Sequence, residues 1–258
     1  VRAQRAQKPA GETLTLAEAT RLMRRGNPEI RDARAAYAAA QTQANVRTPP
    51  ANPTIGLGPL LFGGTDILMN NAGIQPGSSV FSDDATWRRV IDVNFWGIAN
   101  GSRIFGPRMI ERGRPGAIVN TGSKQGITTP PGDPAYNVSK AAVKAFTEAL
   151  EHELRNTEGA RISAHLLIPG HVFTDLTRRD RTEKPAGAWT SEQTADFFID
   201  SLNKGDFYIL CPDNDVERAL DEKRMAWAIG DIIENRPPLS RWHADWSSAF
   251  EKFIEDES

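Results

Sequence analysis

From residue 65 onward the chain alternates short apolar segments with longer amphipathic ones, and this pattern limits the fold more than any other feature. The short apolar segments, which are typical of buried strands, lie at 66–71, 116–120, 161–170 and 206–210. Segments with helical periodicity lie at 84–112, 135–156, 191–203, 215–234 and 239–254. Strands separated by helices of this length favour a parallel sheet with helices on both faces. We therefore expect an α/β domain over residues 61–258.

The first 60 residues have a different pattern. "TLAE", residues 15–18, fits a capping box and predicts a short helix that ends at Gly26. Asn27 and Pro28 then suit the start of a second, Ala-rich helix, which must end before "TPPANP". Residues 1–47 also carry nine Lys/Arg and four Asp/Glu, a balance of +5 in a chain whose net charge is −2. We expect residues 1–60 to be a helical leader of different origin.

The composition, 39% hydrophobic and 25% charged, is that of an ordinary globular protein. A net charge of −2 gives no long-range field that favours nucleic acid or an anionic membrane. No apolar run approaches the roughly 20 residues needed to span a bilayer. We accordingly expect a cytoplasmic protein. Because the chain starts at Val1 rather than Met, we expect a processed, trimmed or partial product.

Metal and cysteine chemistry find little support in the sequence. The only cysteine, Cys211, cannot form an internal disulfide, and we expect a small buried side chain. The four histidines show no metal-ligand spacing, so no metal is assigned. A stripe of aromatic residues at helical spacing favours core or subunit packing over a binding platform; its members are Trp242, Trp246, Phe250 and Phe253.

Tyr136 and Lys140 lie four residues apart in the periodic segment 135–156. That spacing puts both side chains on one face of a helix, one turn apart. An ammonium close to a phenol favours the phenolate and lowers the pKa of the tyrosine from about 10. Such a tyrosine can exchange protons near neutral pH, as a general acid–base must. The simpler interpretation is a surface tyrosine beside a solvated lysine.

Two further polar residues lie where this pair would need them. Ser123 follows the predicted strand 116–120, and ligands of a parallel α/β sheet bind at the carboxyl ends of its strands. Asn94 lies inside the predicted helix 84–112, where an asparagine is disfavoured unless it has a partner or a function. Taken alone, Asn94 favours a capping or kink-stabilising role over a functional one.

Together these residues resemble the short-chain dehydrogenase/reductase family. The matching segments follow the order and nearly the spacing of that family: "NNAG" (70–73), "DVNFWG" (92–97), "NTGS" (120–123), "YNVSK" (136–140) and "PGHVFT" (169–174). The resemblance covers about residues 62–258. It implies a Rossmann-like doubly wound sheet and hydride transfer between NAD or NADP and an alcohol or ketone.

The resemblance implies four catalytic residues. Tyr136 would pass a proton to or from the substrate oxygen, and Ser123 would orient that oxygen. Lys140 would lower the pKa of Tyr136 and, with it, contact the nicotinamide ribose. Asn94 would hold a water in a proton relay toward Lys140. The protein would supply positioning and electrostatics, and the cofactor the hydride chemistry.

The remaining matches imply cofactor contacts. On the adenosine side these are Asn71, Ala72 and Gly73. Near the nicotinamide carboxamide and the pyrophosphate they are Pro169, Gly170, Val172 and Thr174. Residues 174–200 would correspond to the family's mobile substrate lid.

The family's Gly-rich turn, of the type Thr-Gly-x-x-x-Gly-x-Gly, is missing before the first matching strand. Those glycines let the backbone approach the cofactor pyrophosphate at a helix N-terminus. Residues 14–58 instead resemble the N-terminus of outer-membrane efflux channel proteins, in which two helices lead to an "NPT" segment. We therefore expect a fusion that keeps only strands 4 to 7 of the family's sheet, with the strand at 66–70 at its edge.

Three functions follow as hypotheses. The first is an NAD(P)-dependent alcohol dehydrogenase or ketoreductase of a small-molecule substrate. The second is a catalytically impaired relic that lacks the pyrophosphate-binding turn and acts, if at all, as a binding protein. The third is an envelope-associated helical protein, which only residues 14–58 support. The helices 84–112 and 136–156 resemble the family's dimer-forming pair, so we expect a homodimer or homotetramer.

Overall fold

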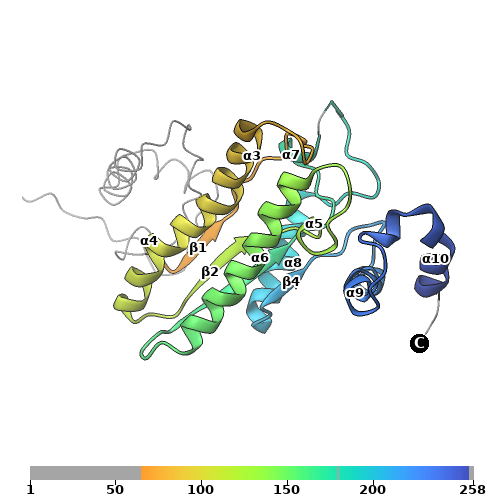
Figure 1. Ribbon diagram of the computed structural model, residues 1–258. Coiled ribbons are helices and arrows are strands. Elements are labelled where there is room, and N and C mark those ends of the chain that lie inside the picture. The colour runs from red at the N-terminus through yellow and green to blue at the C-terminus, as the bar shows by residue number, and fades with distance from the viewer. Residues whose placement is uncertain (1–64, 179, 256–258) are drawn as a thin grey trace, which may run out of the picture. The chain divides into compact units, whose positions relative to one another are not determined.

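A computed structural model describes residues 65–178 and 180–255 (Figure 1). The predictions for residues 1–64 lie outside the described residues. They include the helical leader, the boundary near residue 60 and the resemblance to efflux channel proteins.

The described residues form one four-stranded sheet in which every strand is parallel to its neighbours. Its strands are β1 (Ile67–Asn70), β2 (Gly116–Thr121), β3 (Ile162–Ile168) and β4 (Tyr208–Leu210). They pair in the order β1-β2-β3-β4, with Leu68 opposite Ile118 and Ile118 opposite Ala164. The predicted α/β fold with a parallel sheet is confirmed. Within the described residues β1 pairs only with β2, so it is an edge strand there.

Helices cover both faces of this sheet (Figure 1). On one face Leu68 and Ile118 pack against Met109 and Leu154, which belong to two long helices. On the other face a second cluster joins strand residues to aromatic side chains; it includes Val119, Leu167, Ile209, Trp189 and Phe198. Strands covered on both faces are apolar throughout rather than alternating, which is the pattern in the sequence.

The predicted helix 84–112 is continuous but changes its winding in the middle. It consists of α3 (Asp84–Ile91), a π-helical turn η1 (Asp92–Trp96) and α4 (Gly97–Arg112). Asp83 caps it by accepting a 2.7 Å hydrogen bond from the amide of Thr86. The wider turn contains Asn94, and such turns inside α-helices are frequently found at functional sites.

The predicted helix 135–156 is α6 (Pro134–Arg155), preceded by the short α5 (Gln125–Thr128). Pro134 opens α6 at a position where its missing amide hydrogen is not needed. Tyr136, Lys140, Val143 and Thr147 follow at spacings of four, three and four, and all four are buried. This face of α6 therefore packs against the sheet and carries the predicted catalytic pair.

The segment predicted as a lid, 174–200, contains ordered secondary structure. It holds α7 (Asp175–Arg178) and the first part of α8 (Ser191–Lys204), which has a capping box formed by Thr190 and Gln193. Val172, just before it, pairs with Trp189 in an isolated bridge. Its mobility stays a prediction.

The C-terminal part consists of α9 (Arg218–Ile233), the 3-10 turns η2 (Ser240–Trp242) and η3 (Ala244–Trp246), and α10 (Ser247–Glu255). The prediction of one helix over 239–254 is wrong before residue 247, because Leu239 is left-handed and His243 is extended. Trp227 lies against Trp246, Phe250 and Phe253 at ring-centroid distances of 6.3, 5.4 and 5.2 Å. Packing is thus confirmed for these three members of the aromatic stripe.

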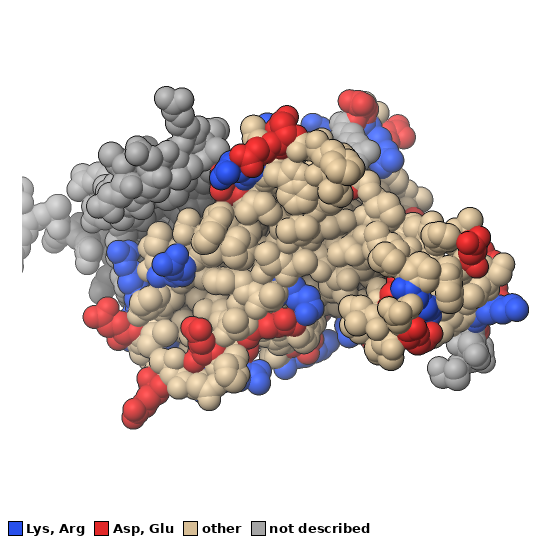
Figure 2. Space-filling view, viewed as in Figure 1, with Lys and Arg blue, Asp and Glu red and all other residues tan. Residues whose placement is uncertain are grey.

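The face seen in Figure 2 carries scattered charges of both signs around a broad uncharged area over α4 and α6. A dimer through these helices stays a prediction. In the described part of the chain no helix is both long and apolar enough to cross a membrane.

Candidate active site

The structure brings Tyr136 and Lys140 together in a buried position beside the end of β2. Their side chains are 6% and 3% exposed, and the Lys140 Nζ lies 5.7 Å from the centre of the tyrosine ring. Nζ donates a 2.8 Å hydrogen bond to the carbonyl of Thr121, the last residue of β2. The pair therefore shares one face of α6 as predicted, and it is not the solvated surface pair of the simpler interpretation.

Burial sets the protonation of both groups. It raises the pKa of Tyr136, an effect opposed by the hydroxyl of Ser123 and supported by the charge of Asp133. Burial also lowers the pKa of Lys140 from 10.5 to about 8. The prediction that the pKa of Tyr136 lies below its ordinary value is wrong for the protein without cofactor. The reason is that removing the phenolate from water, together with repulsion from Asp133, outweighs the hydrogen bond from Ser123.

Ser123 occupies the predicted position just beyond β2. Its hydroxyl interacts with the phenol of Tyr136 and accepts a 3.2 Å hydrogen bond from the amide of Gln125. The side chain is half-buried, so it keeps partial access to solvent. Ser123 and Tyr136 thus form a pair of hydroxyl groups at the carboxyl edge of the sheet, where a substrate oxygen could bind.

Asn94 is fully buried in the π-helical turn, and its amide fixes the loop that follows β1. Its Oδ1 accepts from the amide of Ile74 at 2.7 Å, and its Nδ2 donates to the Ile74 carbonyl at 2.9 Å. Nδ2 also donates to Ser139 Oγ at 3.0 Å, a contact that the sequence did not single out although Ser139 lies inside "YNVSK". Within the described residues these bonds go to the loop after β1 and to α6 rather than to the helix that carries Asn94, so neither capping nor kink stabilisation accounts for them. Its role in holding a water stays a prediction.

The segment "NNAG" lies directly against this group. A Cβ on Gly73 would lie 3.4 Å from Asn94 Oδ1 and 3.6 Å from Lys140 Nζ, so glycine leaves open the space where they approach each other. Asn71, on the exposed side, accepts a 2.9 Å hydrogen bond from Thr121 Oγ1. Ala72 lies between Asn71 and Gly73 in the sequence and is half-buried.

The residues present fit the ribose of a nicotinamide nucleotide. An ammonium has three donors, and Lys140 Nζ makes one hydrogen bond to the part of the chain that the structure describes. A buried cation that has unused donors within the described residues, and that Gly73 approaches without a side chain, suits a pair of ribose hydroxyls. The unused hydrogen-bond donors of Lys140 are the structural observation that favours a nicotinamide nucleotide.

The segment 169–174 follows β3 and lies against a different set of residues. A Cβ on Gly170 would lie 2.5 Å from Asp213 Oδ2, so a larger residue there would require the Asp213 side chain to move. Val172 pairs with Trp189, and the amide of Thr174 donates to Thr177 Oγ1 at 3.0 Å. Pro169 is half-buried after the last strand residue. No hydrogen bond joins this segment to Tyr136 or Lys140 among the described residues, so its cofactor contacts stay a prediction.

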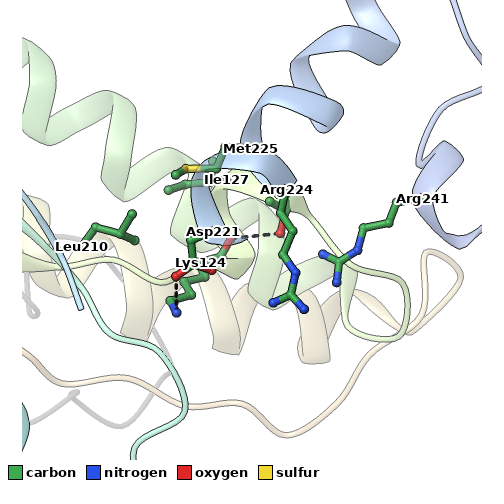
Figure 3. Close-up of a pocket in the computed structure, with 8 residues that line it drawn as sticks. Lys124, Ile127, Leu210, Asp221, Arg224, Met225 and Arg241 are labelled. Atoms are coloured by element: carbon green, nitrogen blue, oxygen red, sulfur yellow. Dashed lines mark hydrogen bonds and ion pairs between the residues drawn. The ribbon is translucent and has the colours of Figure 1, made fainter. Parts of the chain in front are cut away.

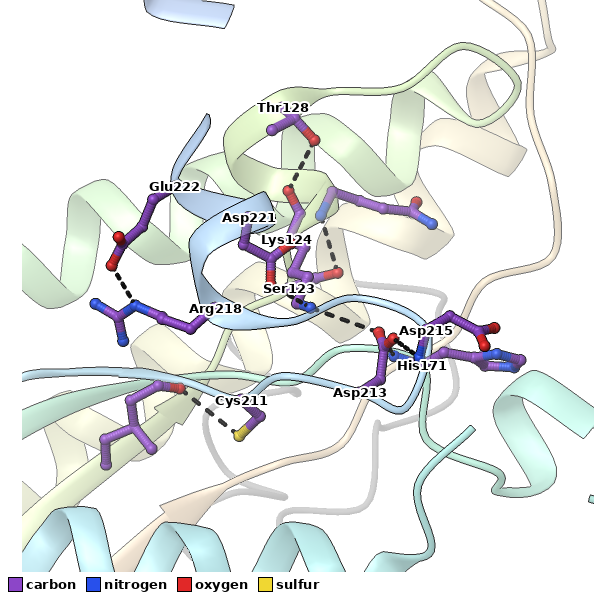
Figure 4. A network of polar contacts seen from close by, with 12 residues as sticks. Ser123, Lys124, Thr128, His171, Cys211, Asp213, Asp215, Arg218, Asp221 and Glu222 are labelled. Carbon is purple, nitrogen blue, oxygen red and sulfur yellow. Dashed lines mark hydrogen bonds and ion pairs between the residues drawn. The ribbon is translucent and has the colours of Figure 1, made fainter. Parts of the chain in front are cut away.

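An ionic cluster beside Ser123 was not predicted from the sequence (Figure 3). The Lys124 ammonium lies 2.5 Å from Asp221 Oδ2 and 3.5 Å from Asp213 Oδ2. Asp213 Oδ2 also accepts a 3.1 Å hydrogen bond from the amide of His171. Figure 4 shows these groups around the loop that carries Ser123. The only signal in the sequence is that Lys124 follows Ser123, because its acidic partners come from a distant segment.

Cys211 plays no part in this chemistry. Its side chain is fully buried, and burial raises the pKa of its thiol to about 12. The thiol therefore stays protonated at neutral pH and is a poor nucleophile. The prediction of a small buried side chain is confirmed.

Comparison with known proteins identifies the family. The family model described as short chain dehydrogenase matches residues 60–185. A 1-deoxy-11-beta-hydroxypentalenate dehydrogenase of Streptomyces exfoliatus is 31% identical over 71% of this chain and 68% of its own length. The chain belongs to the short-chain dehydrogenase family.

Other members of the family show how much of a relative the match spans. A galactitol 2-dehydrogenase (L-tagatose-forming) of Cereibacter sphaeroides is 43% identical, over 46% of this chain and 46% of its own length. A crystal structure of a short-chain dehydrogenase/reductase from Burkholderia phymatum in complex with NAD is 30% identical and covers 69% of each chain, with a TM-score of 0.60. The match therefore spans from about half to about two thirds of these short-chain dehydrogenases.

Proposed function

We propose that the protein is an oxidoreductase that transfers a hydride between NAD or NADP and a small-molecule alcohol or ketone. The observation that carries the proposal is the buried Tyr136–Lys140 pair, with Asn94 and Ser123 beside it and with unused lysine donors. A buried ammonium is unfavourable unless it is paired or has a function. Dehydrogenase relatives and a solved relative with NAD support this assignment.

The chain's own residues would handle the substrate oxygen and its proton. Ser123 and Tyr136 hydrogen-bond that oxygen, and the phenol gives up its proton as a ketone is reduced. The raised pKa of Tyr136 keeps the phenol protonated, and therefore able to donate, at neutral pH. Lys140, with a pKa of about 8, can take up or release a proton in the same range. Asn94 fixes the backbone of Ile74, which follows Gly73 beside Lys140. The groups that would exchange the proton therefore keep their relative positions.

A nicotinamide nucleotide, when bound, supplies or accepts the hydride. Lys140 and Tyr136 would hold its ribose. The other residues proposed to contact it are Asn71, Ala72, Gly73, Pro169, Gly170, Val172 and Thr174. Their part is to position the cofactor and to exclude water.

A second candidate function has its own observation. Residues 1–64 contain no Thr-Gly-x-x-x-Gly-x-Gly segment, so the printed sequence offers no pyrophosphate cradle of the usual type before β1. Such a chain would keep the hydroxyl and lysine groups of the site but bind its ligand without hydride transfer. Cofactor binding decides between the two candidates.

The test is a titration of the full chain with NADH and with NADPH, followed by nicotinamide fluorescence. We expect micromolar binding of one of the two and reduction of at least one ketone in a panel of small substrates. Tyr136→Phe removes only the hydroxyl and should lower kcat at least 100-fold, since a positioned acid contributes about 10²- to 10⁴-fold.

Tyr208→Phe is the matched control. The Tyr208 hydroxyl donates to Glu148 at 2.5 Å on the surface, so this variant should keep the wild-type rate. An unchanged rate in Tyr136→Phe would rule out the assigned proton donor. Absent or millimolar binding of both nucleotides would favour the binding protein.

A further inference from the structure

Two arginines of the C-terminal part line a small cavity beside the ionic cluster (Figure 3). The cavity has a volume of about 60 Å³, and its polar wall consists of Lys124, Asp221, Arg224 and Arg241. The apolar wall includes Ile127, Leu210 and Met225. Pockets for whole cofactors or drug-sized ligands measure roughly 300 Å³ or more, so this one suits a single chemical group.

The charges around the cavity do not balance. Three cations, Lys124, Arg224 and Arg241, line the cavity with one carboxylate, Asp221. A second carboxylate, Asp213, is a partner of Lys124 but does not belong to the lining. Lys124 lies within 4 Å of both carboxylates. Neither arginine has a carboxylate within ion-pair distance in the described part of the chain, and Arg224 Nε is buried there without a hydrogen-bond partner. Within the described residues one positive charge in excess and one buried donor, Arg224 Nε, therefore remain without a partner at the cavity.

The two guanidinium groups also repel each other. The pKa of Arg241 is lowered, first by burial and then by the charge of Arg224. Aromatic rings hold Arg241 in this position, since its Cζ lies 4.8 Å from the Trp242 ring centre and 5.1 Å from that of Phe250. A fork of donors that is fixed, partly buried and short of an anion is a typical binding site for a planar oxyanion.

The cavity is next to the proposed substrate site. Lys124 is the residue after Ser123, and α5, which begins at Gln125, provides Ile127 and Thr128 to the cavity wall. The loop that carries Ser123 is thus shared by the proposed substrate site and the wall of the cavity. The two arginines would then bind a charged group of the substrate at some distance from the reacting carbon.

We infer that Arg224 and Arg241 bind a carboxylate of the substrate, so that the substrate is a hydroxy acid or the corresponding oxo acid. This inference rests on the proposed function, because it concerns the other end of the same substrate. A carboxylate carries one negative charge, which matches the excess of one cation. A phosphate dianion would meet additional repulsion from Asp213 and Asp221.

The test compares oxo acids with their primary amides of equal chain length, using the full chain and its preferred nicotinamide nucleotide. The variants are Arg224→Met and Arg241→Met, with Arg218→Met as the matched control on the same helix. Within the part of the chain that the structure describes, Arg218 is paired with Glu222 alone, on the surface of α9. Wild-type kcat/KM should favour the acids about 10- to 100-fold, the range expected for hydrogen bonds to a charged group. Arg224→Met should remove that preference and leave the rate with amides within about twofold.

A second measurement does not depend on turnover. Thermal unfolding of the wild type should shift upward with millimolar oxo acid, but not with the amide, and the shift should be lost in Arg224→Met. Arg224→Lys keeps the positive charge and should retain part of the shift caused by oxo acid. This variant therefore distinguishes loss of anion binding from loss of the folded structure. Carboxylate binding that depends on Arg224 without any turnover would contradict the proposed function and overturn the assignment of the carboxylate to a substrate.

Two other outcomes would overturn the inference. Equal turnover of acids and amides, unaffected by Arg224→Met, would keep the dehydrogenase and remove the carboxylate site. A shift in unfolding with inorganic phosphate that exceeds the shift with oxo acid would assign the cavity to phosphate instead.

Discussion

Two buried polar regions meet on β2 and α6, and they differ in how completely their hydrogen bonds are satisfied. The first, here called the asparagine network, consists of Asn70, Ser102, Asn120 and Thr147. The second is the Tyr136–Lys140 site. The two regions touch consecutive residues of β2, Asn120 and Thr121, whose side chains point to opposite faces.

The asparagine network is closed upon itself. Asn70 Nδ2 donates to Asn120 Oδ1 at 2.8 Å and to Ser102 Oγ at 3.2 Å. Asn120 Nδ2 donates to Thr147 Oγ1 at 3.1 Å, and that hydroxyl donates to the Val143 carbonyl at 2.7 Å. A satisfied network of this kind ties β1, β2, α4 and α6 into one arrangement.

The Tyr136–Lys140 site is equally buried but leaves donors unused and holds an ammonium away from water. Because both regions are buried, burial alone does not distinguish a functional site from a structural one. What distinguishes the functional site is its unused hydrogen-bond donors. They lower the free energy of unfolding of the free protein and are available to a ligand.

The largest expected effect is that of Lys140→Met, which should lower kcat/KM for ketone reduction at least about 100-fold. The same change should raise the free energy of unfolding at pH 7 by about 1–3 kcal/mol. The reason is that folding lowers the pKa of Lys140 from 10.5 to about 8, so the folded state carries a penalty wherever the lysine is charged. Urea unfolding of both proteins measures the difference.

The pH dependence provides the control. Between pH 8 and 10.5 the unfolded lysine binds more proton than the folded one, so wild-type stability rises with pH relative to the variant. The gap between the two proteins should therefore narrow over this range. A gap that is constant with pH, or a variant less stable at pH 7, would mean that the burial of Lys140 carries no penalty.

The next effect tests the closed region. Asn120→Ala should lower the free energy of unfolding by about 3 kcal/mol, because it removes a buried side chain and leaves Asn70 and Thr147 without partners. The control, Asn203→Ala, changes an exposed position in α8 and should stay within about 0.5 kcal/mol of the wild type. Chemical denaturation compares the three proteins. Equal stabilities would mean that the network contributes nothing to the fold.

The smallest effect is a pair of glycine substitutions in α4. A Cβ on Gly101 would lie within van der Waals overlap of the Asn70 Oδ1 atom, whereas a Cβ on Gly106 would make an ordinary contact, 3.5 Å from Ile118. Gly101→Ala should therefore lower the free energy of unfolding by about 1–3 kcal/mol. Gly106→Ala should be neutral or raise it by up to about 1 kcal/mol. Thermal melts that rank the two variants in the reverse order would contradict the close packing of Asn70.

Local periodicity in the sequence was enough to predict the fold of the described residues and the common helix face of Tyr136 and Lys140. Apolar runs covered on both faces identify all four strands, and the spacing of Tyr136 and Lys140 fixes them to one face of α6. Both conclusions depend on residues close in the chain, whose relative positions the helix or strand geometry already determines.

Tertiary structure alone decided the direction of the pKa shifts, the wide turn at Asn94 and the cavity between Arg224 and Arg241. A pKa depends on how much water a group loses, and burial is set by elements that pack over it from elsewhere in the chain. Lys124 and Asp221 likewise come together only because the ends of β2 and β4 lie at one edge of the sheet and lead into α5 and α9. Contacts of this kind have no fixed spacing in the sequence, which is why the pattern that predicted Tyr136 and Lys140 could not reveal them.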